Sequence, residues 1–162
     1  MFEKLTPRMR RVIDESQRIA RDYEQDYVGT EHLLLAILSE GTGVGAEILT
    51  DLGVTVGKAK KVVDKLIQKS LEDTWVFGRL PGTPHFRNVM AAAIEEARQL
   101  ESKVVCNEHL LLALSREDGS VAQASLHELG VRASTIRREI TKRLDHTCEG
   151  TDAPRANPPG KT

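Results

Sequence analysis

Apolar residues recur at helical spacing along most of the chain, and this pattern predicts an all-α fold. Between Pro7 and about Tyr23, apolar side chains return every three or four residues, and a similar segment begins at Pro84. No segment alternates between apolar and polar residues for long enough to indicate a strand. We therefore expect helices joined by turns, with almost no β-structure.

The pattern occurs twice. The segment TEHLLLA at positions 30–36 reappears as NEHLLLA at positions 107–113, an offset of 77 positions. The same offset pairs residues far from this segment, and about twenty identities fall in one gap-free register. The chain is therefore a tandem repeat, and each copy should fold into the same set of helices.

Each copy predicts four helices. The expected bounds in the first copy are 7–23, a helix from 30, 44–52 and 56–69; those in the second are a helix from 84, a helix from 107, 121–129 and 133–144. The dense apolar runs after positions 30 and 107 predict helices that are buried on most sides, at the centre of each repeat.

Capping residues mark several of these helix ends. Thr6 and Thr83 each precede a proline. Proline suits the first helical position because the N–H that it lacks has no partner there, so both threonines are predicted N-caps. Thr30 and Asn107 are the predicted N-caps of the second helices. A glycine at 53 and another at 130 stand where a left-handed C-cap is needed.

We thus predict an all-α, pseudo-twofold tandem of two four-helix units with eight helices in total. The expected division is repeat 1 over 1–69, a linker over 70–82, repeat 2 over 83–146 and a disordered tail rich in proline and glycine over 147–162. In the linker, Trp75 and Phe77 are expected to pack onto the repeats, with an exposed contact for a partner as the alternative.

Charge and hydropathy restrict the possible partners and location. The 23 basic and 24 acidic residues give a net charge of −1, which disfavours a nucleic acid as the main partner. No apolar run approaches the roughly 18 residues that a membrane-spanning helix needs, so we expect no membrane association and a cytoplasmic location. Cys106 and Cys148 are expected to be reduced thiols.

No motif predicts catalysis, a metal or a cofactor. The segment 53–59 resembles a phosphate-binding loop but has too few residues between its glycines and lacks the Ser/Thr that would hold Mg²⁺. His32 and His109 each follow a glutamate, but neighbouring residues on a helix point about 100° apart and cannot readily share one ion. These histidines are expected to be hydrogen-bonded structural residues.

Glu31 and Glu108 are the most informative polar positions, and two interpretations remain open. A carboxylate in the first turn offsets the helix macrodipole by about 0.3–1 kcal/mol, which alone explains an acid in both copies. Alternatively, the two acids hold a cationic group beside helix N-termini that hold an anion. The candidate ligand-binding residues are Glu31, Glu108, Thr6, Thr83, Thr30 and Asn107.

The doubled segment with VGTEHLLLA at 28–36 resembles the Clp N-terminal repeat, which precedes the ATPase rings of ClpA-, ClpB- and ClpC-type unfoldases, and it is most similar to ClpC. The resemblance covers roughly 1–145. It implies an eight-helix domain that binds substrates and adaptor proteins and passes substrates to the ATPase. In ClpC-type proteins of Gram-positive bacteria it also implies recognition of phosphorylated arginine, with Glu31 and Glu108 holding the guanidinium. Cys106 and Asn107 depart from the Gly-Thr of the family pattern.

The expected function is therefore a non-catalytic module for substrate and adaptor recognition in the Clp unfoldase and protease system. Its expected partners are protein substrates, adaptors and Clp ATPase or protease components. One alternative is a free-standing accessory subunit that binds Clp components or competes for substrates without binding phosphoarginine. The others are a hydrolase that uses the glutamate and histidine pairs, and a regulatory interaction protein unrelated to proteolysis.

Overall fold

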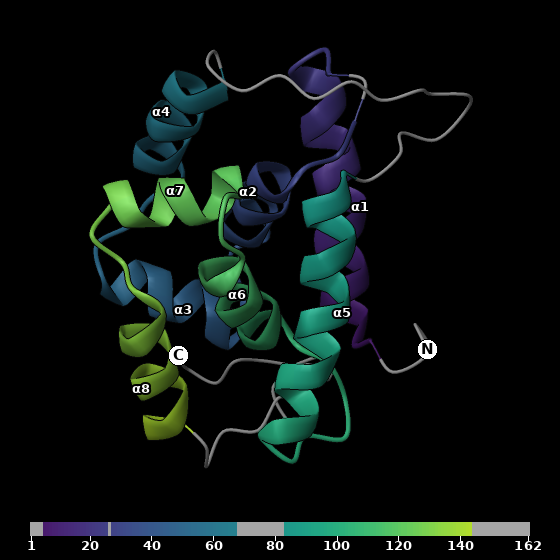
Figure 1. Cartoon of the computed structure of the whole chain (residues 1–162), viewed down its shortest axis with the longest axis vertical. Coiled ribbons are helices and arrows are strands. Elements are labelled where there is room, and N and C mark those ends of the chain that lie inside the picture. The colour runs from purple at the N-terminus through teal and green to yellow at the C-terminus, as the bar shows by residue number, and fades with distance from the viewer. Residues whose placement is uncertain (1–4, 26, 68–82, 144–162) are drawn as a thin grey trace.

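The computed structural model describes residues 5–25, 27–67 and 83–143. This part of the chain contains eight helices and, apart from one isolated parallel bridge between Leu5 and Val105, no β-pairing. The helices are α1 (Pro7–Asp22), α2 (Thr30–Glu40), α3 (Gly43–Asp51), α4 (Val56–Ile67), α5 (Pro84–Gln99), α6 (Asn107–Arg116), α7 (Val121–Glu128) and α8 (Ala133–Lys142) (Figure 1). The predicted all-α tandem of four-helix units is confirmed.

The first helix of each repeat begins as predicted. Thr6 precedes α1, and its Oγ1 accepts a hydrogen bond of 3.1 Å from the Met9 N–H. Thr83 precedes α5 and accepts an equivalent bond of 3.1 Å from the Phe86 N–H. These bonds satisfy donors that the start of a helix otherwise leaves without a partner.

The third helix of each repeat ends on a left-handed glycine, also as predicted. Gly53 follows α3 with a φ of +85°, and Gly130 follows α7 with a φ of +81°. After Gly53, the Val54 N–H returns to the Leu49 carbonyl at 2.9 Å, which closes the helix end with the bond of a Schellman motif. The fourth helix of the second repeat ends at Lys142, slightly earlier than expected, and the fourth helix of the first repeat is described as far as Ile67.

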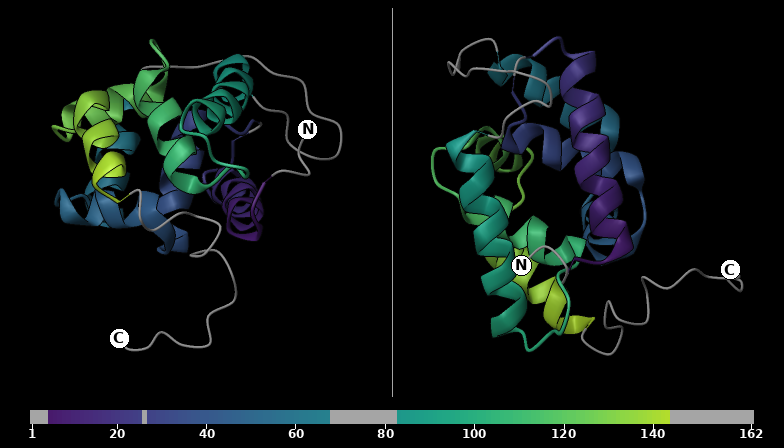
Figure 2. Two further views of the ribbon diagram at one scale, coloured as in Figure 1. Left: turned by 90° about the horizontal axis from the view of Figure 1, so that it is seen from below. Right: turned by 90° about the vertical axis from the view of Figure 1, so that its right-hand side faces the viewer.

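The two repeats interlock around one core. Helices α2 and α6 contact each other at the centre, and the third helix of each repeat packs on the second helix of the other, α3 on α6 and α7 on α2 (Figures 1 and 2). Helix α4 likewise packs on α7, and α3 contacts α8. The buried apolar side chains of both repeats consequently form one cluster, so neither repeat completes a core of its own.

Some expectations fall outside the described residues. The undescribed part of the chain includes the whole predicted linker over 70–82, with Trp75 and Phe77, and the predicted tail over 147–162. The domain boundaries therefore stay predictions. Among the described helices, none is by itself long and apolar enough to cross a membrane. The bent pair α2 and α3, which meet at 90°, satisfies those criteria only when taken together.

Candidate functional site

The starts of α2 and α6 differ from the sequence prediction. Thr30 and Asn107 are the first helical residues, and the N-caps are the residues before them, Gly29 and Cys106. Neither of these two residues supplies a side-chain hydrogen bond to its helix. Thr30 and Asn107 are therefore not the N-caps that the sequence predicted.

Histidines close these two helix starts instead. His32 Nδ1 accepts a hydrogen bond of 2.9 Å from the Gly29 N–H, and His109 Nδ1 accepts one of 2.9 Å from the Cys106 N–H. A side chain at the third helical position that binds the N-cap N–H forms half of a capping box. Burial lowers the pKa of each histidine to about 4, so both imidazoles are neutral, with the proton on Nε2. The expectation that both histidines are structural is confirmed.

The Thr30 and Asn107 side chains reach across to the other repeat. Thr30 Oγ1 accepts a bond of 3.1 Å from the Ala122 N–H in the first turn of α7. Asn107 Oδ1 accepts a bond of 3.0 Å from the Gly45 N–H in the first turn of α3, and its Nδ2 donates to the Thr42 carbonyl at 2.8 Å. Each side chain therefore caps the third helix of the opposite repeat, and both are almost completely buried.

At each of these two contacts, the size of the capping side chain suits the size of the residue that it faces. The larger Asn107 faces Gly43 and Gly45, and a Cβ on Gly45 would lie 2.8 Å from the Asn107 carbonyl oxygen. In the second repeat the corresponding residues are Ser120 and Ala122, and the residue that bonds to Ala122 is the smaller Thr30. The contact thus occurs in both repeats with the residue sizes reversed. A large asparagine faces glycine in one, and a smaller threonine faces alanine in the other.

Glu31 and Glu108 are the second residues of α2 and α6, and both are buried, with 2% and 6% of their surface exposed. The Tyr27 hydroxyl donates to Glu31 Oε2 at 3.3 Å. The Glu31 carboxylate lies in the space that the absent side chain of Gly29 leaves, because a Cβ there would be 2.5 Å from Oε1. Cys106 fills the matching position beside Glu108, so the two acids have different surroundings.

Backbone contacts between the repeats divide the candidate residues into two groups. The Thr83 N–H donates to the Val28 carbonyl at 3.1 Å, which sets the start of α5 beside the segment that leads into α2. The Thr6 N–H donates to the Val105 carbonyl at 3.2 Å and sets the start of α1 beside the segment that leads into α6. The groups, each drawn from both repeats, are Thr83 with Thr30 and Glu31, and Thr6 with Asn107 and Glu108.

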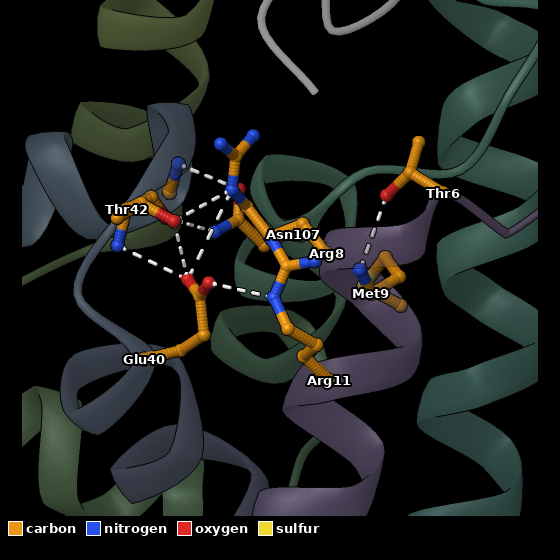
Figure 3. Close-up of polar contacts among 8 residues, drawn as sticks. Thr6, Arg8, Met9, Arg11, Glu40, Thr42 and Asn107 are labelled. Carbon is orange, nitrogen blue, oxygen red and sulfur yellow. Dashed lines mark hydrogen bonds and ion pairs between the residues drawn. The ribbon is translucent and has the colours of Figure 1, made fainter. Parts of the chain in front are cut away.

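An ion-pair cluster that sequence reasoning missed borders the second group (Figure 3). Arg11 Nε donates to Glu40 Oε2 at 3.2 Å, and Arg8 Nε donates to Thr42 Oγ1 at 2.7 Å. The Thr42 hydroxyl in turn donates to Glu40 Oε1 at 2.6 Å, and the Thr42 carbonyl accepts from Asn107. The cluster therefore connects the start of α1 with the cap of α3.

The second repeat holds a related cluster with less positive charge. His85 Nδ1 lies 2.7 Å from Glu117 Oε2, and Asn88 Nδ2 donates to the same oxygen at 3.0 Å. These three residues occupy the positions of Arg8, Arg11 and Glu40 at the offset of 77. In the sequence, the signal for both clusters was the offset of 77 positions, which places polar residues at the same three positions of each repeat.

One group of possible metal ligands occurs among the described residues. Cys106, Glu108 and His109 offer atoms that all lie within 4.8 Å of one another. Cys106 is disulfide-bonded, which corrects the expectation of a reduced thiol and removes its sulfur as a thiolate ligand. The chain's other cysteine, Cys148, lies outside the described residues. Two remaining donors do not make a metal site, so the chemistry of this region is that of buried carboxylates beside helix starts.

Comparisons with known proteins agree with the doubled architecture. The chain matches the Clp repeat (R) N-terminal domain over residues 4–76 and 82–160. It is 37% identical over 153 residues to the chloroplastic chaperone protein ClpC2 of Oryza sativa subsp. japonica, covering 94% of this chain and 16% of that protein. It is 36% identical over 162 residues to a Guillardia theta homologue of the ATP-dependent Clp protease ATP-binding subunit ClpA, covering 100% of this chain and 19% of that one.

Solved structures show the same fold. The N-terminal domain of the chaperone ClpD from Arabidopsis thaliana aligns with a TM-score of 0.73 and 26% identity, covering 90% of this chain and 97% of that one. The ClpV N-domain in its complex with a VipB peptide aligns with a TM-score of 0.67 and 19% identity, covering 91% of both chains. The chain thus spans nearly all of these solved domains but less than a fifth of the curated relatives above.

Proposed function

The chain belongs to the Clp repeat (R) N-terminal domain family, and from this premise we propose that it is a non-catalytic module that recognises protein substrates and adaptors for a Clp ATP-dependent unfoldase. The relatives named above are a Clp chaperone and an ATP-binding Clp subunit, of which this chain corresponds to 16% and 19%. A role in delivering proteins to such an ATPase is therefore part of the proposal.

The observation that carries the proposal is the paired construction of the two candidate groups. Each group combines one buried acid, Glu31 or Glu108, with the start of a helix from the other repeat. A carboxylate suits a guanidinium, and N–H groups at a helix start suit an anion. The finer proposal is that each group binds an arginine phosphate, which carries both charges. The peptide in the ClpV complex supports a polypeptide as the ligand class.

Burial sets a condition on this binding. Because Glu31 and Glu108 are 2% and 6% exposed, a guanidinium reaches them only if neighbouring side chains move. At Glu31 the Tyr27 hydroxyl must give up its bond of 3.3 Å. In repeat 2 the corresponding residue is Val104, which has no hydroxyl. Competition from a tyrosine hydroxyl is therefore specific to the Glu31 group.

The test is fluorescence anisotropy with a labelled unfolded protein, prepared with and without phosphorylated arginines. Wild-type chain should bind the phosphorylated form more tightly. Glu31→Gln combined with Glu108→Gln, which preserves side-chain size, should weaken that binding by about tenfold or more, because it removes two charge-assisted contacts. Glu47→Gln, which removes one carboxylate at an exposed position of α3, should leave binding unchanged.

Two results would contradict the proposal at different levels. If a folded, helical sample bound neither form of the unfolded protein, the recognition function itself would be wrong. If it bound both forms equally, and the double variant bound as well as wild type, Glu31 and Glu108 would be helix-terminus residues only.

A further inference from the structure

A polar cavity lies on the second repeat, where the end of α6, the helix α7 and the start of α8 come together. Its volume is about 540 Å³. Most of its lining residues carry polar or charged side chains, chief among them Arg116, Asp118, Gln123, His127, Arg132 and Ser134.

The first repeat provides an internal comparison for this lining. At the offset of 77, the same six positions are occupied by small or uncharged residues, namely Ser39, Gly41, Ala46, Thr50, Thr55 and Gly57. The fold of the repeat therefore does not require charge here. The two arginines and the histidine are specific to the second copy.

Positive charge predominates around the cavity. Arg116 pairs with Glu96 at 2.7 Å, but the same carboxylate also pairs with Arg137 at 2.8 Å, so two guanidiniums share one acid. Arg132 has no ion pair within the described part of the chain. Asp118 is the acid in the lining, and it accepts a bond of 3.1 Å from Gln123. The balance favours an anionic ligand.

The start of α8 adds to this preference. In the first repeat, Thr55 Oγ1 accepts a bond of 3.1 Å from the Lys58 N–H and so caps α4. In the second repeat Arg132 stands at that position, and α8 begins without a side-chain cap. The second repeat thus has the cation Arg132, which lines the cavity, where the first repeat has a threonine that accepts a hydrogen bond from a helix N–H.

We propose that this cavity binds an oxyanion of a protein ligand, a carboxylate or a phosphate, between the guanidiniums of Arg116 and Arg132. An arginine can hold either group through two parallel hydrogen bonds. The site is separate from Glu31 and Glu108, which would attract a guanidinium. It rests on the proposed function only in taking a polypeptide as its ligand.

The test is a titration of the ¹⁵N-labelled chain followed by NMR, using inorganic phosphate, a glutamate-rich peptide and the same peptide with one phosphoserine. Each saturating probe should shift the amide signals of Ser134 and Thr135, and sodium chloride should weaken binding. The peptide arms determine whether a carboxylate or a phosphate is the preferred source of the oxyanion. None of the probes contains a guanidinium, so the result is independent of the Glu31 and Glu108 groups.

Arg132→Thr is the decisive variant because it installs the residue that the first repeat uses as a cap. The variant should fold at least as stably as wild type and bind each probe about tenfold more weakly. Arg138→Thr removes an equal charge from an exposed position of α8 outside the cavity lining and should bind like wild type. The proposal is overturned if no probe shifts the Ser134 and Thr135 signals, or if Arg132→Thr binds as tightly as Arg138→Thr.

Discussion

Asn107 caps a helix of the other repeat, since its Oδ1 accepts a hydrogen bond of 3.0 Å from the N–H of Gly45, 62 positions away. The pseudo-symmetric bond joins Thr30 to Ala122 across 92 positions. These bonds fix the third helix of each repeat against the second helix of the other, and they lie next to Glu31 and Glu108 in the chain. The geometry of the candidate site therefore depends on both repeats.

Asn107→Ala should lower the free energy of unfolding by about 2 kcal/mol, because the variant loses a helix cap and leaves the Gly45 N–H and the Thr42 carbonyl without their partner. Urea unfolding followed by circular dichroism measures the change. Asn107→Asp, which keeps an acceptor for the Gly45 N–H but not the donor to Thr42, should lie between alanine and wild type. Equal stability of all three proteins would show that the contact contributes nothing.

Gly45→Ala should destabilise the fold by about 1–3 kcal/mol, because the new Cβ would lie 2.8 Å from a backbone oxygen of Asn107 and one of the helices must shift. Gly57→Ala is the matched control. Gly57 is an exposed helical glycine of α4 whose Cβ would meet only the Thr55 hydroxyl, at 3.9 Å, so this change should be neutral or stabilising. Thermal unfolding compares the pair, and similar midpoints would contradict the close packing of α3 on α6.

Features that depend on neighbours within a few positions were predictable from the sequence. The helices, the Thr6 and Thr83 caps and the Gly53 stop arise from local spacing and local hydrogen bonds. Thr30 and Asn107 were misassigned because the groups they bind lie in the other repeat. A Thr or Asn at the start of an apolar run gives the same sequence pattern whether its side chain caps its own helix or a different one.

Burial and proximity in the candidate site could not be predicted in the same way. The repeated acids identified Glu31 and Glu108 as a pair, but their low exposure results from packing that the sequence pattern does not contain. Arg116 and Arg132 line one cavity although the whole of α7 separates them in the chain. The disulfide state of Cys106 was predicted wrongly. The ligand-binding role of the six candidate residues and the cytoplasmic location stay predictions.

Stability should fall as the pH is lowered from about 6.5 to 4. Burial lowers the pKa of His32 and His109 from 6.5 to about 4, so the unfolded chain takes up protons on these imidazoles before the folded chain does. The neutral histidines contribute fully to the free energy of unfolding above pH 6.5. By pH 4, each has lost roughly 3 kcal/mol of that contribution. Urea unfolding at a series of pH values measures the slope.

The three carboxylates whose pKa is lowered do not obscure the part of this window between pH 6.5 and 4.5. Arg18 holds the pKa of Glu15 below its usual 4.5, and Arg98 and Arg143 do the same for Glu95 and Glu139, so stabilisation from these carboxylates is lost only as the pH falls below about 4.5. His109→Gln provides the comparison, because a glutamine at the third helical position can accept the Cys106 N–H without titrating. Its slope between pH 6.5 and 4.5 should be about half that of wild type. A flat wild-type profile would contradict neutral buried histidines.

The most direct test of the recognition account is a calorimetric titration of the chain with phosphoarginine, with arginine and phosphoserine as controls. In Arg132→Thr, which removes the separate oxyanion cavity, the pseudo-twofold arrangement predicts two binding events for phosphoarginine and none for either control. Added to Arg132→Thr, Glu31→Gln or Glu108→Gln alone should each leave one event, and both together none. A folded chain that gives no heat with phosphoarginine, or that binds it equally well in the double variant, would contradict the assignment of these two acids as its ligand contacts.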